Sequence, residues 1–347
     1  MLLLFILAIC VAALGAFGIP KPLTRRCDDL LSRDVTSYVN GFFIVLVFLK
    51  HGKDYVPVEC LSGLDNLYLA TAGRAGQMIV TTFLMYSGYG IMESICSKEN
   101  YVERMPTSRI LPFVLDVAIA LVPYAVYCAA RGQAPTLDYV LLALVGRKSL
   151  GNSNWYIFAI LCMWAITWVA FKVARKPWQG LGLVVAGTLV YILVLWMDNP
   201  VEGTRWYNTI FCYPAGMAMS LLLRRYGPPD LRRSICGIVV CAVVFVAAYF
   251  SWEPYILMYN ARSIAFALAI TLAVMNVRYL SVPFVWAGKN LFYLYIYHRL
   301  ALMLLRPLAP LAQFGTLIYF GASVLLLLGW CLIAPKVHIA ARRLLFG

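Results

Sequence analysis

The sequence predicts an all-α fold, a polytopic transmembrane bundle of about eleven helices. The first observation is composition: 63% of the residues are hydrophobic and 13% are charged, and the mean hydropathy is +0.80. A soluble domain is only about half apolar and about a quarter charged. The second is a series of apolar runs of membrane-crossing length. Backbone groups in lipid must be satisfied within their own segment, so these runs are predicted as helices rather than strands.

The apolar runs give the expected helices in chain order. The first run has no Lys or Arg before it and is followed by Lys21 and Arg25, which favours a retained anchor over a cleaved signal peptide. Residues 1–31 are therefore expected to form an N-terminal helix with a basic linker, and residues 32–347 the main membrane domain. The expected spans are 2–19, 35–51, 75–96, 110–129, 154–174, 178–197, 206–223, 234–250, 255–275, 284–305 and 313–334.

The charge distribution predicts the orientation of these helices. The net charge is +14, which in a soluble chain would suggest a nucleic-acid partner. With the N-terminus outside, 18 of the 29 Lys and Arg residues fall in inner loops and 8 in outer loops or outer helix ends. That asymmetry is what the positive-inside rule describes. We therefore expect the C-terminus in the cytoplasm, the lipid bilayer as surroundings, and no nucleic acid.

Cysteine and histidine give no sign of a metal site. The ten cysteines are scattered singly through apolar segments without a CxxC pair, and the chain has three histidines. Free cysteine behaves as a small buried hydrophobe, so most are predicted to be packing residues. Cys60 and Cys128 both fall near expected outer segment ends, and a disulfide between them is left open.

Polar residues inside the expected helices are the candidates for function. Asn40 and His51 are eleven residues apart, so they share one helix face about 16 Å apart, with His51 at the outer end. His298 and Arg299 lie deep enough in their helix to be interior. His338 falls beyond the last expected span and is predicted to be solvated in a basic tail.

Six short motifs then appear in an order that resembles the acyltransferase type 3 family, integral-membrane enzymes that modify extracytoplasmic glycans and lipids. The resemblance covers about Ser32 to Ala334. The motifs are Ser32-Arg33-Asp34 before a helix ending in His51, Phe83 to Gly90, Arg104 with Arg109-Ile110-Leu111-Pro112, Gly151 to Ile157, Arg205 to Thr209 with Gly216-Met217, and Tyr295 to Arg299.

The resemblance implies a ten-helix core, matching the second to eleventh expected spans, and a reaction. An acyl group, with acetyl expected, would pass from cytoplasmic acyl-CoA to a hydroxyl of a cell-envelope polysaccharide or glycolipid. No metal is implied. The protein would reside in the plasma membrane, which in a bacterium is the inner membrane.

The resemblance also implies roles for individual residues. His51 would be the general base, since imidazole titrates near neutral pH, and an acyl-histidine intermediate stays open as an alternative. The other implied sets are listed by role. Oxyanion donors are Asn40, Ser87, Tyr89 and His298, although helix packing is the plainer role for Ser87. The phosphates of acyl-CoA would bind to Arg33, Arg104 and Arg109, unless these residues serve only to determine the orientation of the chain in the membrane. The acceptor would contact Asn152, Asn154, Trp155 and Arg205, unless these form an ordinary wet interface.

One position departs from the family's pattern. The family has Arg or Lys where this chain has Asn40, in the motif R-x10-H that ends at His51. Asparagine keeps a hydrogen-bonding group but loses the fixed charge. The change is compatible with altered donor preference, with compensation by another cation such as Arg33, or with a non-catalytic relative that binds acyl-CoA or a glycan. A secondary transporter is the other alternative, although no internal repeat typical of transporters is found.

Overall fold

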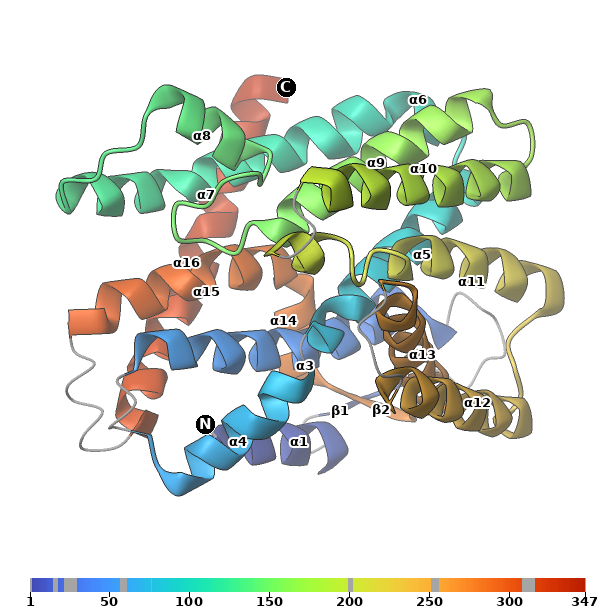
Figure 1. Ribbon diagram of the computed structural model, residues 1–347, viewed down its shortest axis with the longest axis horizontal. Helices are drawn as coiled ribbons and strands as arrows, with labels where there is room; N and C mark the ends of the chain where they lie inside the picture. Colours follow the sequence, from blue (N-terminus) through green and yellow to red (C-terminus); the bar gives the residue numbers. More distant parts are fainter. Residues whose placement is uncertain are drawn as a thin grey trace.

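A computed structural model describes residues 2–14, 18–21, 30–56, 61–75, 77–198, 202–250, 256–307 and 316–346. The described chain is almost entirely helical (Figure 1). Seven segments in it are long and apolar enough to cross a membrane. A transmembrane helix bundle is therefore confirmed, while the count of eleven crossings stays a prediction. The seven segments are Arg33–Tyr55, Tyr101–Ala130, Trp155–Val173, Pro177–Asp198, Leu231–Phe250, Ile256–Met275 and Leu317–Leu345.

The main elements follow the expected spans closely in the middle of the chain. Their bounds are α1 Leu2–Leu14, α3 Arg33–Gly52, α4 Gly63–Ala75, α5 Thr81–Ser97, α6 Tyr101–Met105, α7 Leu111–Ala130, α8 Leu137–Leu144, α9 Trp155–Val173, α10 Pro177–Asp198, α11 Cys212–Tyr226, α12 Leu231–Phe250, α13 Ile256–Met275, α14 Val282–Lys289, α15 Leu291–Leu305 and α16 Thr316–Phe346. Short helical turns are η1 Lys53–Tyr55, η3 Met78–Val80, η4 Pro106–Ile110 and η5 Glu202–Trp206.

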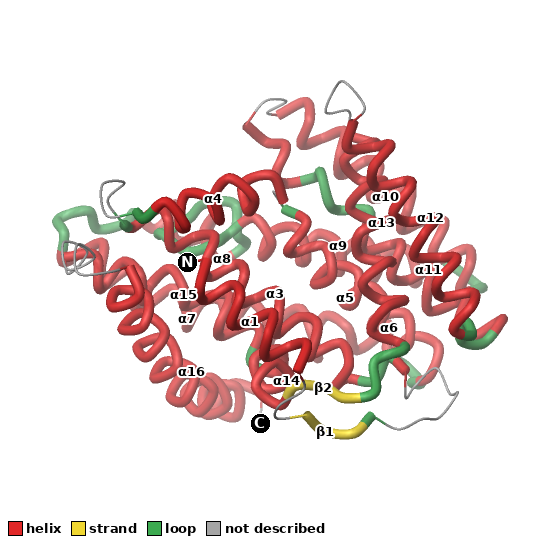
Figure 2. The backbone as a smooth tube through the Cα atoms, turned by 90° about the horizontal axis from the view of Figure 1, so that it is seen from below, coloured by secondary structure: helices red, strands yellow, loops and turns green. Residues whose placement is uncertain are grey.

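Several boundaries differ from expectation. The first helix, α1, has 13 residues, too few for a bilayer core that needs about 20. The chain then forms strand β1, Gly18–Pro20, which pairs antiparallel with β2, Tyr279–Ser281 (Figure 2). The expected span 284–305 is broken into α14 and α15 at Asn290, whose side chain donates to Trp286 O at 3.0 Å. Helices α4 and α8 were not expected.

Lys21 fastens this N-terminal segment to the end of α13. Its Nζ donates to Val274 O at 2.9 Å and to Met275 O at 3.0 Å. These are carbonyls in the last turn of α13, which has no helical partners for them. Burial lowers the pKa of Lys21 to about 8.

The prediction that His338 lies solvated in a basic tail is wrong. Helix α16 continues through this position, and the His338 side chain is fully buried. Its Nδ1 lies 3.1 Å from Asp116 Oδ1 and its Nε2 lies 3.2 Å from the Tyr297 hydroxyl, while Arg342 also donates to Asp116. A buried charge is stable when it is paired in this way, so this network joins α7, α15 and α16.

Glycines allow two helix pairs to approach closely. A Cβ added to Gly88 of α5 would lie 2.0 Å from Tyr213 O of α11, and one added to Gly216 of α11 would lie 1.9 Å from Met85 O. Gly41 of α3 and Gly288 of α14 make the same kind of contact. The small residues near Ser87 therefore serve helix packing, as small residues do between membrane helices.

We predict that Gly88→Ala destabilises the protein by about 2 kcal/mol, because the new methyl group would overlap backbone that cannot rotate away. The measurement is thermal unfolding in detergent. Gly90→Ala in the same helix is the matched control, since nothing lies within 4 Å of an added Cβ there. Equal unfolding midpoints for the two variants would show that the α5–α11 contact tolerates a side chain.

Candidate active site

Helices α3 and α15 lie against each other and run in the same direction. Just before α15, at the last residue of α14, Lys289 Nζ lies 2.7 Å from Oδ1 of Asp34 in the first turn of α3. Further along, the ring centroid of His51 lies 5.1 Å from that of His298. The two histidines expected from the sequence to be functional are therefore brought together by this parallel pairing.

A cavity of about 220 Å³ opens beside His51. We call it the histidine pocket. Its walls come from α3, η3, the start of α9, η5 and α15, and three of its lining side chains are Lys, Arg and Arg. It is lined by Val47, Lys50, His51, Gln77, Ile79, Val80, Ser153, Asn154, Trp155, Arg205, Tyr295 and Arg299.

Asp54 provides a carboxylate for His51. Asp54 Oδ2 lies 3.7 Å from His51 Nδ1 and 3.8 Å from Arg299 Nη2, while Arg299 Nε donates to the Tyr55 hydroxyl at 3.0 Å. The side chains of His51 and Asp54 are 27% and 42% exposed, so solvent weakens this attraction. The carboxylate is placed to orient the imidazole and to favour its protonated form during a reaction.

His298 lies behind His51 and is fully buried. Its Nδ1 lies 2.7 Å from Tyr295 O. A carbonyl only accepts hydrogen bonds, so Nδ1 carries the proton, and in the neutral ring Nε2 has a lone pair. Neither His298 Nε2 nor the Tyr295 hydroxyl makes a well-formed hydrogen bond to any other described residue. The lone pair of His298 Nε2 is therefore available to a ligand or to a reacting group, and the Tyr295 hydroxyl, which lies near Ser153 and the Tyr156 backbone, must turn from them to reach one.

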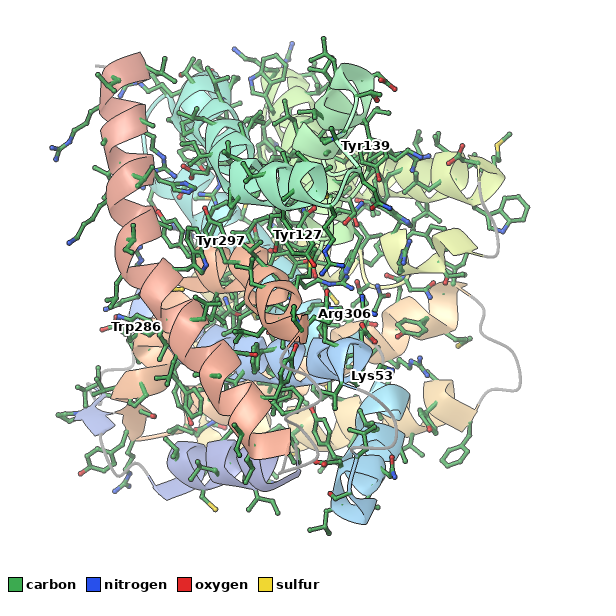
Figure 3. All side chains as sticks on the ribbon, turned by 90° about the vertical axis from the view of Figure 1, so that its left-hand side faces the viewer. Lys53, Tyr127, Tyr139, Trp286, Tyr297 and Arg306 are labelled. Atoms are coloured by element: carbon green, nitrogen blue, oxygen red, sulfur yellow. The ribbon has the colours of Figure 1, made fainter. Side chains whose placement is uncertain are left out.

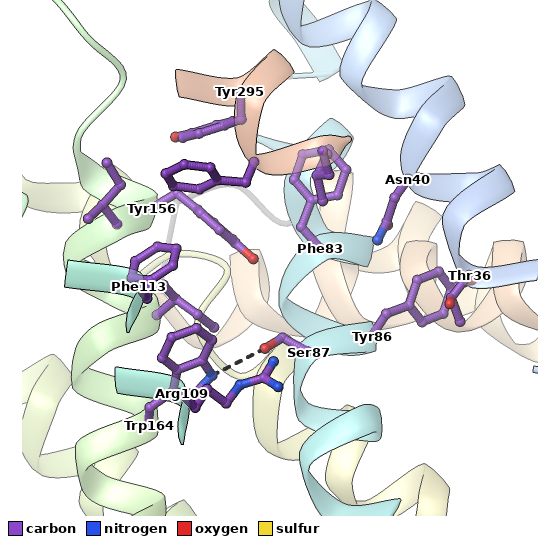
Figure 4. A pocket seen from close by; sticks show the side chains of 14 residues that line it. Thr36, Asn40, Phe83, Tyr86, Ser87, Arg109, Phe113, Tyr156, Trp164 and Tyr295 are labelled. Carbon is purple, nitrogen blue, oxygen red and sulfur yellow. Dashed lines mark hydrogen bonds between the residues drawn. The ribbon is translucent and has the colours of Figure 1, made fainter. Parts of the chain in front are cut away.

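A second cavity, of about 260 Å³, lies toward the starting end of α3. We call it the arginine pocket. Half of its lining residues are aromatic, and Figure 4 shows Arg109 and Ser87 at one end of it and Tyr295 at the other. It is lined by Thr36, Asn40, Phe83, Tyr86, Ser87, Arg109, Phe113, Tyr156, Ile157, Ile160, Trp164, Leu291, Phe292 and Tyr295.

A π-helical turn positions Arg109. The turn is η4, and it lies between α6 and α7 in one continuous helical run. Such turns widen a helix locally and often occur at functional sites. The guanidinium carbon of Arg109 lies 4.6 Å from the Trp164 ring, and Trp164 Nε1 donates to Ser87 Oγ at 3.4 Å. Arg109 is the one charged residue that lines this pocket among the described residues.

Asn40 faces the same pocket from α3 (Figure 4). Its Oδ1 is buried and makes no hydrogen bond within the described part of the chain. Arg109, rather than Arg33, shares a cavity with Asn40, since Arg33 is exposed and lines neither pocket. Arg109 is therefore the cation to test for compensation of the charge that Asn40 lacks.

Tyr295 lines both pockets. Arg299 follows it by one helical turn on the same face of α15 and lines only the histidine pocket. A line from Arg109 past Tyr295 to His51 thus runs through the interior of the bundle, with a cavity on each side of the tyrosine.

The structure brings together most of the residues singled out in the sequence, but not all. Most of them line one of the two pockets, and His298 packs against His51. The lining residues are His51, Asn40, Ser87, Arg109, Asn154, Trp155 and Arg205. The others lie elsewhere: Tyr89 is buried in α5, and Arg33 and Arg104 are exposed. Asn152 is 1% exposed, and its Oδ1 accepts from Leu150 N at 3.1 Å, so it stabilises the turn before α9.

The structure bears in part on the disulfide between Cys60 and Cys128 and on the presence of a metal site. Cys60 lies outside the described residues, and Cys128 Sγ lies 3.6 Å from Leu150 O. No group of three or more His, Cys, Asp or Glu side chains is placed to hold a metal ion in the ranges that the structure describes.

Two features of the site went unnoticed in the sequence. Asp54 had a usable signal, because it follows His51 by three residues on a continuing helical path, where side chains are neighbours. Tyr295 was part of a motif but had no role assigned.

A comparison with family models matches residues 37–334 to one described as an acyltransferase domain. No curated protein and no solved structure matches the chain.

Proposed function

The chain belongs to this acyltransferase family and is an acyltransferase, and from that premise we propose that it moves an acyl group, with acetyl expected, from acyl-CoA to a saccharide hydroxyl across the membrane. The observation that carries the proposal is the pair of cavities that meet at Tyr295. Arg109 lines one of them, and His51 lines the other. A donor and an acceptor could thus approach the same point from opposite sides.

The arginine pocket suits the donor. Acyl-CoA carries several phosphate charges, which a guanidinium binds with charge-assisted hydrogen bonds. The aromatic walls suit the apolar part of the arm that ends in the thioester. We propose that this pocket opens to the cytoplasm, in keeping with the excess of cations in the loops assigned to that side.

The histidine pocket suits the acceptor. In the proposed reaction the acceptor oxygen attacks the thioester carbonyl while His51 takes the hydroxyl proton. The carbon–sulfur bond then breaks, and the CoA thiolate leaves and receives the proton that His51 had taken, which gives the thiol and returns His51 to its neutral form. Tyr295, at the junction, is placed to donate to the carbonyl oxygen as its negative charge develops. The products are the acyl ester and free CoA.

We propose that Asp54 acts through His51 as a positioning residue. Asp54→Asn keeps the size of the side chain but removes the charge, and we expect kcat to fall about tenfold with KM for the acceptor unchanged. The effect is modest because the pair is partly exposed. Asp54→Glu should restore most of the rate. A change in KM alone, or no rescue by Glu, would assign Asp54 to the acceptor or to folding instead.

The proposal is tested with the purified full chain in lipid nanodiscs and radiolabelled acetyl-CoA. We expect label to appear in an extracted cell-envelope glycan or glycolipid, and mass spectrometry of glycans from cells with and without the chain should show the same acyl group. Uptake of a substrate by vesicles without acyl-CoA would instead favour transport. Absence of any acyl-CoA turnover with an intact fold would favour a non-catalytic binding relative.

A further inference from the structure

A third cavity, of about 520 Å³, lies at the same end of the bundle as the histidine pocket. We call it the tyrosine pocket. Figure 3 views this end of the molecule, where α7 and α15 end, and labels Tyr127 and Tyr139 on it. The walls come from the end of α7, the loop before α8, α8 itself, the loop before α9, and α15. The pocket is lined by Tyr127, Cys128, Arg131, Gln133, Ala134, Pro135, Thr136, Tyr139, Ser149, Leu150 and Met303.

The tyrosine pocket and the histidine pocket are neighbours. Met303 lines the first and Arg299 lines the second. These two residues are four apart on one face of α15, which is a rise of about 6 Å. The loop before α9 separates the two cavities, because Ser149 and Leu150 line the first and residues 153–155 line the second. A chain molecule bound beside His51 therefore has only this loop to cross before it enters the tyrosine pocket.

The loop between the two cavities is held in one conformation by its own contacts. Gly151 has a φ of 112°, which glycine adopts without strain, and a Cβ added there would lie 2.7 Å from Met303 Sδ. Ser149 Oγ donates to Asn152 O at 2.6 Å, and the Tyr139 hydroxyl donates to Ser149 O at 2.9 Å. The wall that the cavities share is thus formed before a ligand binds, which lowers the entropy cost of binding.

The lining of the tyrosine pocket suits a sugar ring, which has hydroxyl groups around its edge and C–H groups on its faces. Tyr127 and Tyr139 are half-buried, and a tyrosine ring offers both a flat apolar surface and a polar tip. Gln133 is exposed at the rim, and its amide can donate and accept hydrogen bonds. Small-molecule sites combine apolar walls with a few polar groups in this way.

We propose that the tyrosine pocket binds a second sugar unit of the acceptor, so that the acceptor is an oligosaccharide or polysaccharide rather than a single sugar. This inference rests on the proposed function and deepens it. The unit that is acylated lies beside His51, and the next unit crosses the loop before α9 and lies between Tyr127 and Tyr139. A single sugar fills only the histidine pocket and loses the contacts of the second.

The test compares acceptors of different length in the transfer assay with the full chain in nanodiscs. The intact cell-envelope glycan is cut by mild acid, and fragments of one, two and four sugars are separated. We expect kcat/KM for the longer fragments to exceed that for the single sugar at least about tenfold. The second unit adds contacts without a second loss of overall translational freedom.

Two variants locate the preference for longer fragments. Ala134→Trp fills the tyrosine pocket from an exposed position of the loop before α8, and should bring kcat/KM for the longer fragments down to about that for the single sugar. Ala130→Trp is the matched control, because Ala130 is an exposed alanine at the end of α7 that lines none of the three pockets. It should keep the preference. Thermal unfolding in detergent checks that both variants fold.

Gln133→Ala is a milder second variant for the case in which Ala134→Trp does not fold. It removes one amide from the same loop, and we expect the preference for longer fragments to fall about fivefold. An unchanged preference in this variant would then count against the tyrosine pocket.

Three results would overturn the inference: equal kcat/KM for all lengths, a preference that survives in Ala134→Trp, or a preference that Ala130→Trp also abolishes. Each of these leaves acyl transfer beside His51 intact. Absence of transfer to the intact glycan as well as to its fragments would instead reject the proposed function itself.

Discussion

His51→Ala is expected to lower kcat/KM for acyl transfer about 1,000-fold, while the protein still inserts and folds. The physical reason is that a sugar hydroxyl is a poor nucleophile at neutral pH. His51 lines the acceptor pocket and has a carboxylate at 3.7 Å. The measurement is the rate of label transfer from acetyl-CoA in nanodiscs, with thermal unfolding as the check on folding.

Lys53→Ala is the matched control, since Lys53 is exposed, lies two residues further on at the same end of α3 and lines neither pocket. It should transfer at close to the wild-type rate. Full transfer by His51→Ala would reject this histidine as the base, and attention would pass to His298, the other imidazole at the site.

The His51→Ala variant also distinguishes a general-base mechanism from a nucleophilic one. A direct transfer leaves no covalent enzyme species, whereas a nucleophilic His51 would accumulate an acyl-imidazole when acceptor is withheld. Acyl label on the peptide that contains His51, found after mixing with acetyl-CoA alone, would favour the nucleophilic route. Its absence from wild type, together with loss of transfer in the alanine variant, would favour the general base.

The sequence predicted the membrane bundle well because helices in lipid are set by local composition. The expected spans 154–174, 178–197, 234–250 and 255–275 each fall within a few residues of α9, α10, α12 and α13. The predictions fail where contacts between residues far apart in the sequence determine the structure. The pairing of β1 with β2 joins residues 18–20 to 279–281, which no local pattern reveals.

The break at Asn290 has a local cause, but a prediction based on the length of the apolar run does not detect it. Asparagine can bond to the backbone of the preceding turn and so compete with regular helix geometry. Asn290 does this through Trp286 O, and the expected span 284–305 becomes two helices. This break separates α14, which packs on α3 through Gly288, from α15, which presents Tyr295 and Arg299 to the pockets.

The sequence indicated which types of residue would form the candidate site, but not which individual residues of each type would line it. From the sequence alone, Arg33, Arg104 and Arg109 were equally good candidates for binding the acyl-CoA phosphates, since all three lie in loops expected to be cytoplasmic. Of the three, Arg109 lines the arginine pocket, while Arg33 and Arg104 line neither this pocket nor the histidine pocket. The direction of the Arg109 side chain depends on the π-helical turn η4, which no local sequence pattern indicates. Similarly, Asn152 and Asn154 are two residues apart, yet one stabilises a turn and the other lines the histidine pocket.

Arg109→Gln is expected to raise KM for acetyl-CoA about 30-fold, with a smaller effect on kcat. A hydrogen bond to a charged group contributes about 1.5–3 kcal/mol, and a loss confined to ground-state binding appears in KM. Initial rates at varied acetyl-CoA concentration, with acceptor saturating, make the measurement. Arg104→Gln is the matched control, because Arg104 is an exposed arginine of the same continuous helical run, in α6, and lines neither the arginine pocket nor the histidine pocket.

Asn40→Arg tests whether Arg109 has taken over the charge that the family's pattern places at position 40. Both side chains face one cavity from opposite elements, α3 and η4. If the cavity needs one cation regardless of which element supplies it, Asn40→Arg should change wild-type activity little but restore KM for acetyl-CoA in the Arg109→Gln background. The two changes would then be strongly non-additive, as expected for residues that share a function. A gain in kcat from Asn40→Arg alone would mean that Arg109 does not compensate and that this chain has a weakened site. If the double variant is no better than Arg109→Gln, the position of the guanidinium matters as well as its charge, because its donors are fixed in a planar fork.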